Sequence, residues 1–555
     1  MFGVWAVARQ TFSQSLRMKV AAVFIAILAV AIGGMPFYME GDGTLAGKIR
    51  TYLSYSTGLT GVLLALVTVM LSVAVVASDV RDKQIFTVAV KPLPRWQYIL
   101  GRWLGVVMFD AVLLSVALVG TYALAQYLRG LPTNPSDRRA VETEVFTARA
   151  AVAPEPIAPR VEELVQDRVR KMREEKGEKN TFELAVGEFQ AKYGGSREEA
   201  EARLFGELRK QARQALQSVP PTPPPYGQAL VWRFTNVHVA TGRAEGTATF
   251  QAVAESLPLI RLHAGAELIG RVMPNGPVKI EGVEGRIETI GADFLDVVFR
   301  PDDMKRAQIA RLREGMAVRI TVDPTIQIRY QAKPLGDAPG DVIPSEWRIR
   351  NPTTNLVYVI ARDEPVRIQQ TLTIPARAVD EQGVTEVYYF SRPNERTGTG
   401  ATVQILEEDI SLLYHVGGFE ANFVRGYAMI FIQLMFLAAL GVCAGSFLSF
   451  PVGCLLAILA IPLGLMRDFL TDALKIPAAG GDPFTVLGHY LFGAVKAMLP
   501  DFDKALPGES LVEGLLISWS AVGASALWTV GLRVALVLAM ACVIFHKREL
   551  ARVQV

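Results

Sequence analysis

Few residues of this sequence suit a metal site or a disulfide framework. Among 555 residues there are three cysteines and five histidines, and no Cys-x-x-Cys or His-x-x-x-His spacing joins them. Zinc sites need such close spacing, and disulfide scaffolds need many more cysteines. Cys443, Cys454 and Cys542 lie far apart in apolar runs, so they indicate no particular redox compartment. The sequence therefore predicts no metal centre.

Motifs of hydrolases and nucleotide-binding enzymes are missing as well. There is no Gly-x-Ser-x-Gly and no His-Glu-x-x-His. A phosphate-binding loop needs Gly-x-x-x-x-Gly-Lys-Ser/Thr. The most similar stretch, residues 41–49, has Asp42 in place of the first glycine and Ile49 in place of the hydroxyl residue. We therefore expect no enzymatic activity and no cofactor bound by this chain.

The net charge is small, whereas apolar residues are abundant. The 57 basic and 54 acidic side chains leave +3 at pH 7, which excludes a strongly basic nucleic-acid binder and predicts no nucleic acid as partner. Hydrophobic residues make up 51% of the chain, and charged residues 20%. The mean hydropathy of +0.28 is high for a soluble protein with so many charges, so two kinds of segment are averaged together.

Long apolar runs separate these two kinds of segment. A helix needs about 20 apolar residues to cross the hydrocarbon core of a bilayer. The runs are Val20–Phe37, Ser56–Ser78, Leu104–Tyr127, Tyr427–Phe450, Val452–Met466 and about Leu515–Phe545. We therefore predict an α-helical integral membrane protein with six transmembrane helices. The first run lacks a small-residue cleavage site, which favours a retained anchor over a signal peptide.

The distribution of lysine and arginine predicts the orientation, because these residues are enriched in short cytoplasmic loops. They precede the first span, lie between the second and third, and follow the sixth. Residues 468–513 carry an acidic excess instead. Both termini are therefore expected in the cytoplasm, and residues 129–425 outside it.

Residues 129–425 hold most of the charge and no run long enough to cross a membrane. Residues 136–218 have apolar residues at helical spacing, which predicts a helical stalk or hairpin. Five prolines between residues 220 and 225 form a stiff connector. From Trp232 to Val416, short runs rich in Val, Ile, Thr and Tyr predict one or two antiparallel β-sandwiches. The expected organisation is an interfacial helix at 1–19, spans 1–3 at 20–128, a helical region at 129–219, a β domain at 220–425 and spans 4–6 at 426–555.

The loop between the second and third spans carries the strongest functional signal. Residues 79–90 are compatible with a short amphipathic helix in which Ile85 and Phe86 form an apolar patch. Pro92 and Pro94 end it, and Arg95 with Trp96 could anchor the next span at the interface. Such a helix could receive force from a docked partner. An ordinary basic loop with an aromatic anchor is the alternative interpretation.

A family resemblance favours the first interpretation, a helix that receives force from a partner. The order Asp79, Pro92, Arg95, Trp96, Gly101, Arg102 resembles the cytoplasmic coupling loop of permease subunits of ABC transporters of the type 2 exporter class. The ending Phe545–Leu550, reading Phe-His-Lys-Arg-Glu-Leu, and the six-span plan are also similar. Permeases described as of copper-enzyme-maturation or gliding-motility type have the most similar layout. The chain departs at Lys83-Gln84, where Gly-Thr or Arg-Thr is more usual, and in its large external insert.

The resemblance implies that this chain forms the membrane path in a cytoplasmic (inner) membrane, while a separate ATP-binding subunit hydrolyses ATP. It also implies a second permease chain, identical or different. The coupling loop would span residues 79–102, and contact with the ATPase would involve Asp79, Arg81, Asp82, Ile85, Phe86, Arg95 and Trp96. A rival interpretation is a multi-span membrane anchor whose external β domain binds a partner and serves as a scaffold.

Further expectations concern charges and helices at the membrane. Asp110 and Arg533 lie within spans three and six, at depths that permit an ion pair, although each could instead reach water separately. Residues 2–18 place Trp5, Phe12 and other apolar residues on one face, which predicts an interfacial helix or, alternatively, a frayed tail. The resemblance suggests re-entrant or interfacial helices at residues 484–499, and a plain interfacial loop is the alternative.

Overall fold

The computed structural model divides into two compact units, residues 1–148 with 417–555, and residues 149–416. We call them the helical unit and the inserted unit. The structure describes residues 2–39, 41–81, 94–174, 181–222, 227–239, 244–251, 259–264, 272, 276–281, 283–291, 294–299, 315–322, 324–336, 342–393, 400–466, 490, 493, 496–500, 502 and 507–547.

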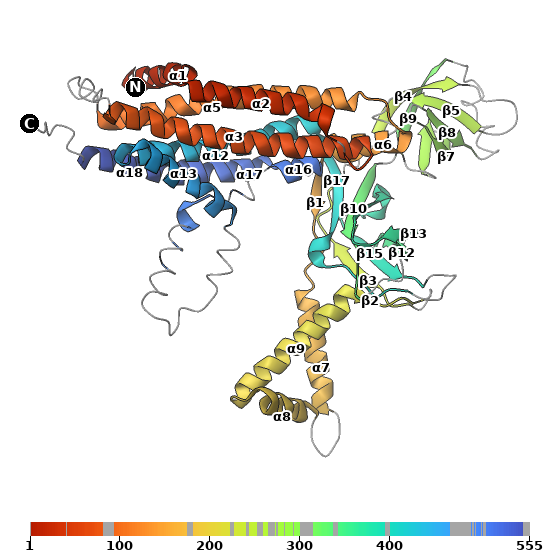
Figure 1. Ribbon diagram of the computed structural model, residues 1–555. Coiled ribbons are helices and arrows are strands. Elements are labelled where there is room, and N and C mark those ends of the chain that lie inside the picture. Colours follow the sequence, from red (N-terminus) through yellow and green to blue (C-terminus); the bar gives the residue numbers. More distant parts are fainter. Residues whose placement is uncertain are drawn as a thin grey trace, which may run out of the picture. The chain divides into compact units, whose positions relative to one another are not determined.

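The helical unit holds most of the long helices of the chain (Figure 1). Its helices are α1 (Phe2–Leu16), α2 (Lys19–Tyr38), α3 (Leu45–Arg81), α5 (Arg95–Arg129), α6 (Pro135–Ala140), the π-helix η1 (Val141–Val145), α12 (Phe419–Phe447), α13 (Phe450–Leu465), α16 (Gly508–Val512), α17 (Trp519–Ala526), the π-helix η5 (Leu527–Val534) and α18 (Ala535–Lys547). The last three follow one another without a break, so residues 519–547 form one long helix.

Among the described residues, four helices are long and apolar enough to cross a membrane: Leu45–Asp79, Arg95–Arg129, Phe419–Phe447 and Trp519–Lys547. They coincide with the second, third, fourth and sixth predicted spans. The first and fifth predicted spans correspond to the shorter apolar helices Ala22–Tyr38 and Phe450–Leu465. At 1.5 Å per residue, the 16 residues of α13 are about 24 Å long, which is less than the hydrocarbon thickness.

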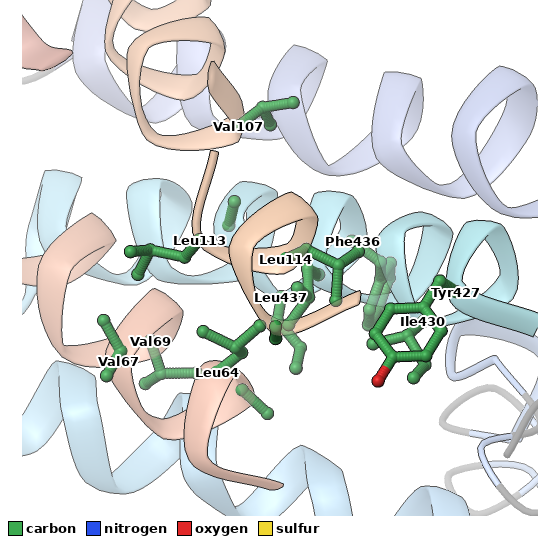
Figure 2. Close-up of a cluster of buried hydrophobic side chains, with 14 of the residues drawn as sticks. Leu64, Val67, Val69, Val107, Leu113, Leu114, Tyr427, Ile430, Phe436 and Leu437 are labelled. Atoms are coloured by element: carbon green, nitrogen blue, oxygen red, sulfur yellow. The ribbon is translucent and has the colours of Figure 1, made fainter. Parts of the chain in front are cut away.

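The core of the helical unit lies between α3, α5 and α12, which pack against one another. Figure 2 shows apolar side chains from these helices in one cluster, including Leu64, Leu114 and Leu437. The helix α12 comes close to α3 at Gly441, where a Cβ atom would collide with the Ser72 side chain. A small residue lets two helix backbones approach closely, so this glycine permits the packing.

The inserted unit contains three helices with their own core: α7 (Ala158–Glu174), α8 (Thr181–Tyr193) and α9 (Arg197–Gln217). Val161, Val165 and Val169 of α7 are buried at a spacing of four residues. This is the helical periodicity expected for the region from its sequence. The Ser196 hydroxyl caps α9 by accepting from the Glu199 amide at 3.3 Å.

The strands of the chain are antiparallel wherever their register is determined. They are β1 (Thr147–Val152), β2 (Ser218–Val219), β3 (Leu230–Phe234), β4 (Ala244–Gln251), β5 (Leu259–Ala264), β6 (Pro277–Ile280), β7 (Val283–Ile290), β8 (Phe294–Val298), β9 (Ala317–Val322), β10 (Thr325–Gln331), β11 (Lys333–Pro334), β12 (Val342–Arg350), β13 (Val357–Pro365), β14 (Gln369–Pro375), β15 (Thr385–Ser391), β16 (Val403–Gln404) and β17 (Ile410–Gly418).

Six of these strands form a closed barrel in the order β4-β5-β8-β7-β6-β9, where the sequence predicted sandwiches (Figure 1). Closure occurs at β9, because Val322 is paired with Ala244 of β4 on one side and with Val278 of β6 on the other. Alternating residues such as Val318 and Ile320 fill the interior. A barrel and a sandwich need the same alternation of apolar and polar residues, so the sequence pattern did not distinguish them.

The other strands form two four-stranded sheets, β1-β17-β10-β14 and β13-β12-β15-β3, and a small sheet of β11, β16 and β2. Residues of all three sheets share a core in which Trp347 is fully buried. The carboxylate of Glu364 is also fully buried there. It accepts hydrogen bonds from the Tyr330 hydroxyl at 2.5 Å, the Ser345 hydroxyl at 3.0 Å and the Trp347 indole at 2.9 Å. A buried charge with several donors is a position that tolerates little change.

Candidate functional site

A buried ion pair joins the end of α3 to the start of α5. Asp79 and Arg102 are in contact, and the side chains of both are 4% exposed. The Tyr98 hydroxyl also donates to Asp79 Oδ2 at 2.6 Å. Tyr98 and Arg102 are four residues apart, so they lie on one face of α5 and reach the same carboxylate. This pair therefore brackets the segment that the sequence marked as a coupling loop.

Arg102 also binds α1. Its Nη1 donates to Thr11 Oγ1 at 3.1 Å and to Gln14 Oε1 at 3.0 Å. The guanidinium lies 5.2 Å from the centre of the Tyr98 ring, at cation–π distance. One buried cation thus connects α1, α3 and α5.

Small residues let α1 lie close to α5. A Cβ atom at Gly101 would lie 2.6 Å from Val7 Cβ, and one at Gly105 would lie 2.6 Å from the Ala8 carbonyl oxygen. The two glycines form a Gly-x-x-x-Gly stripe of the kind that brings helices into contact in membranes. Ala8 is fully buried as a result. The predicted N-terminal helix therefore forms at Phe2–Leu16, and it packs on α5.

The C-terminal end of α18 belongs to the same cluster. Arg95 Nη1 donates to the carbonyl oxygens of Phe545 at 3.3 Å and His546 at 2.7 Å. The last carbonyl groups of a helix lack partners within it and carry partial negative charge, so an arginine stabilises this end. The ring of Phe545 also stacks on Tyr98 with a centroid distance of 5.4 Å. We call Asp79, Arg95, Tyr98 and Arg102, with their contacts on α1 and α18, the clamp.

The sequence-predicted coupling residues fall into three groups. Asp79 is only 3% exposed and belongs to the interior of the clamp. Arg81, Arg95 and Trp96 are exposed. Asp82, Ile85 and Phe86 lie outside the described residues. Of the proposed helices at residues 484–499, residues 490, 493 and 496–498 are helical, whereas residues 484–489, 491, 492, 494 and 495 lie outside the described residues.

Sequence reasoning named Asp79 and Arg102 as motif positions but missed that they bind each other. It also missed the contribution of Thr11, Gln14 and Tyr98. The Gly-x-x-x-Gly spacing at Gly101 was a usable signal for a docked helix, although it does not identify which helix docks.

The two charges predicted within spans contact different groups. Asp110 is fully buried, and its Oδ1 lies 3.0 Å from the Thr68 hydroxyl of α3. Arg533 lies in η5, and its Nε donates to the Ala497 carbonyl oxygen at 3.3 Å. No ion pair joins Asp110 to Arg533 in the part of the chain that the structure describes.

The other end of α3 is also held by a carboxylate. Asp137 of α6 accepts from the amides of Leu45 at 2.6 Å and Ala46 at 3.1 Å, and from the Thr133 hydroxyl at 2.6 Å. Partial burial alone would raise the pKa of Asp137, but these hydrogen bonds outweigh it and lower the pKa below its usual value. The long central helix is therefore fixed at both ends.

Within the described ranges, no group of three or more His, Cys, Asp or Glu side chains is placed to hold a metal ion. Comparison with models of protein families and with curated proteins found no match to this chain.

Proposed function

We propose that this chain is the membrane-spanning permease subunit of an ATP-driven transporter of the type 2 exporter class. A separate subunit would bind and hydrolyse ATP, and a second permease chain, identical or different, would complete the pathway. The proposal includes six spans, with α2 and α13 as the first and fifth. It places both termini in the cytoplasm and the inserted unit outside a cytoplasmic membrane.

The clamp is the observation that carries this proposal. The segment between Arg81 and Arg95 leaves α3 two residues after Asp79 and enters α5 three residues before Tyr98. Asp79 and Tyr98 contact each other. Arg102 connects them to α1, and Phe545 connects them to α18. A push on the segment by a docked ATPase would therefore reach four helices at once. A loop that served only as a link would not need a buried ion pair, whose desolvation is costly.

The contacts of the clamp would couple movements of the ATPase subunit to movements of the helices. Polar contacts between helices in a membrane have few alternative partners, so a displaced clamp residue would carry its helix along or leave a buried charge unpaired. Closure of the ATPase subunits would shift the ends of α3 and α5, and these helices form the core with α12.

Co-purification tests the proposal directly. The tagged full chain, extracted in mild detergent, should bring down an ATP-binding subunit with measurable ATP hydrolysis. Arg81→Glu, at an exposed position beside the clamp, should reduce both the recovered subunit and the hydrolysis. Arg17→Glu is the matched control, because Arg17 is also exposed and the charge change is the same.

Two results would contradict the proposal. In the first, no ATP-binding subunit is recovered in any mild detergent. In the second, Arg81→Glu and Arg17→Glu behave alike. A scaffold protein, the rival function, would give the first result and would instead co-purify with a partner of the inserted unit.

A further inference from the structure

Asp110 occupies an unusual position that the proposed coupling does not use. It is fully buried in the middle of α5, between the buried residues Phe109 and Leu113. Leu64, Val107, Leu113 and Leu114 belong to the same apolar cluster, as Figure 2 shows. A carboxyl group in such surroundings needs several hydrogen bonds or a cation to remain charged.

Asp110 has neither in the described part of the chain. Among the residues that the structure describes, only Oδ1 has a hydrogen-bond partner, the Thr68 hydroxyl, while Oδ2 has none. The neighbouring stretches, residues 22–37 of α2, 56–78 of α3, 103–121 of α5 and 428–447 of α12, contain no titratable side chain except Asp110 itself and Cys443. From the last long helix, Arg533 contacts the backbone of Ala497, and Cys542 lies beside Cys443. Arg102 is eight residues away along α5, about 12 Å at the helical rise.

The number of hydrogen bonds that Thr68 can donate indicates whether the Asp110 carboxyl group is protonated. The Thr68 hydroxyl lies 2.7 Å from the Leu64 carbonyl oxygen and 3.0 Å from Asp110 Oδ1. A hydroxyl has one hydrogen to donate, so it cannot donate to both acceptors. If Thr68 donates to Leu64, then the contact with Oδ1 is a hydrogen bond only when the carboxyl group itself donates. Both contacts are satisfied by the chain Asp110 O–H to Thr68 O–H to Leu64 C=O.

We propose that Asp110 is a proton-binding site in the core of the helical unit. In the closed bundle the carboxyl group keeps one proton and uses it to donate a hydrogen bond to the Thr68 hydroxyl oxygen. When α3 and α5 separate and water reaches the group, the carboxyl releases that proton and becomes charged. The closed bundle therefore binds one more proton than the open one, so lowering the pH favours the closed bundle. The inference is independent of the ATP-binding partner.

Proton release on unfolding tests the site. The full chain in detergent, unfolded at pH 7 in a weakly buffered solution with a pH indicator, exposes Asp110 to water, where a carboxyl group is ionised. Wild type should release one more proton per chain than Asp110→Asn, which carries a neutral group of similar size. Asp137→Asn is the control, because hydrogen bonds lower the pKa of Asp137 in the folded chain; this carboxyl group is therefore ionised at pH 7 before and after unfolding, and its replacement should not reduce the release.

Infrared spectroscopy gives a second measurement that does not need unfolding. At pH 7 the folded wild type should show a carbonyl band of a protonated carboxyl group, and Asp110→Asn should lack it. Thr68→Val should keep the band but shift its frequency, because the carboxyl group loses its hydrogen-bond partner. Should Asp110→Asn fail to fold, the Thr68→Val spectrum still decides. Equal proton release by wild type and Asp110→Asn, or a wild-type spectrum without this band, would overturn the proposal.

Discussion

The ion pair of Asp79 with Arg102 should make the two residues strongly interdependent for stability. Both side chains are buried, and Arg102 also donates to Thr11 and Gln14. Among the described residues, Arg102→Met leaves the buried Asp79 with only the Tyr98 hydroxyl as donor. Removing one partner of a buried pair costs about 3–5 kcal/mol, whereas replacing both charges by uncharged groups costs far less. We therefore expect each single variant to lose about 3–5 kcal/mol and the double variant Asp79→Asn/Arg102→Met to lose no more than either single one.

Denaturant unfolding in detergent, followed by tryptophan fluorescence, measures these differences. The double-mutant cycle should give a coupling free energy of at least about 3–5 kcal/mol, the size of one single loss, which is outside the range of an exposed pair. The control is Arg197 with Glu183, whose side chains are 60% and 49% exposed, so its coupling should be no more than about 1 kcal/mol. Additive losses at Asp79 and Arg102 would refute the reasoning, because they would mean that the two charges do not stabilise each other.

Two further predictions concern other carboxylates. Glu364→Leu removes the acceptor of three buried donors and should cost the inserted unit about 3–5 kcal/mol in denaturant unfolding, whereas Asp363→Asn, at the exposed neighbouring position, should change it by no more than about 0.5 kcal/mol. Asp137→Ala should lower the stability of the helical unit by about 1–2 kcal/mol at pH 7. Because the pKa of Asp137 is lowered in the folded state, its contribution is present above about pH 4 and is lost as the pH falls further. Thermal unfolding at pH 7 and pH 3 should therefore show a difference between wild type and Asp137→Ala that shrinks at pH 3; a constant difference would contradict this.

Much of the fold could be predicted because its signals are local. Apolar runs of sufficient length mark the four long helices, and the spacing of Val161, Val165 and Val169 marks a helix in the inserted unit. Alternating residues likewise mark the strands. What the sequence did not show was barrel closure, since the pairing of Val322 with two strands joins residues far apart in the chain.

The candidate site could be predicted only in part, for the same reason. Asp79 and Arg102 stand out individually as charged residues at the ends of apolar runs, and the family resemblance picked out both positions. Their partnership, and the attachment of Thr11, depend on how three helices pack.

By itself, the sequence of this protein determined which segments are apolar enough for a membrane, which are polar, and which periodicity each follows. Hydropathy and periodicity are properties of neighbouring residues, so no knowledge of the packing was needed. Only the tertiary structure decided that Asp79 is an interior residue, that α1 lies on the glycines of α5, and that Asp110 meets the Thr68 hydroxyl group. Burial and pairing are properties of distant segments brought together, and they determine what a charged side chain can do.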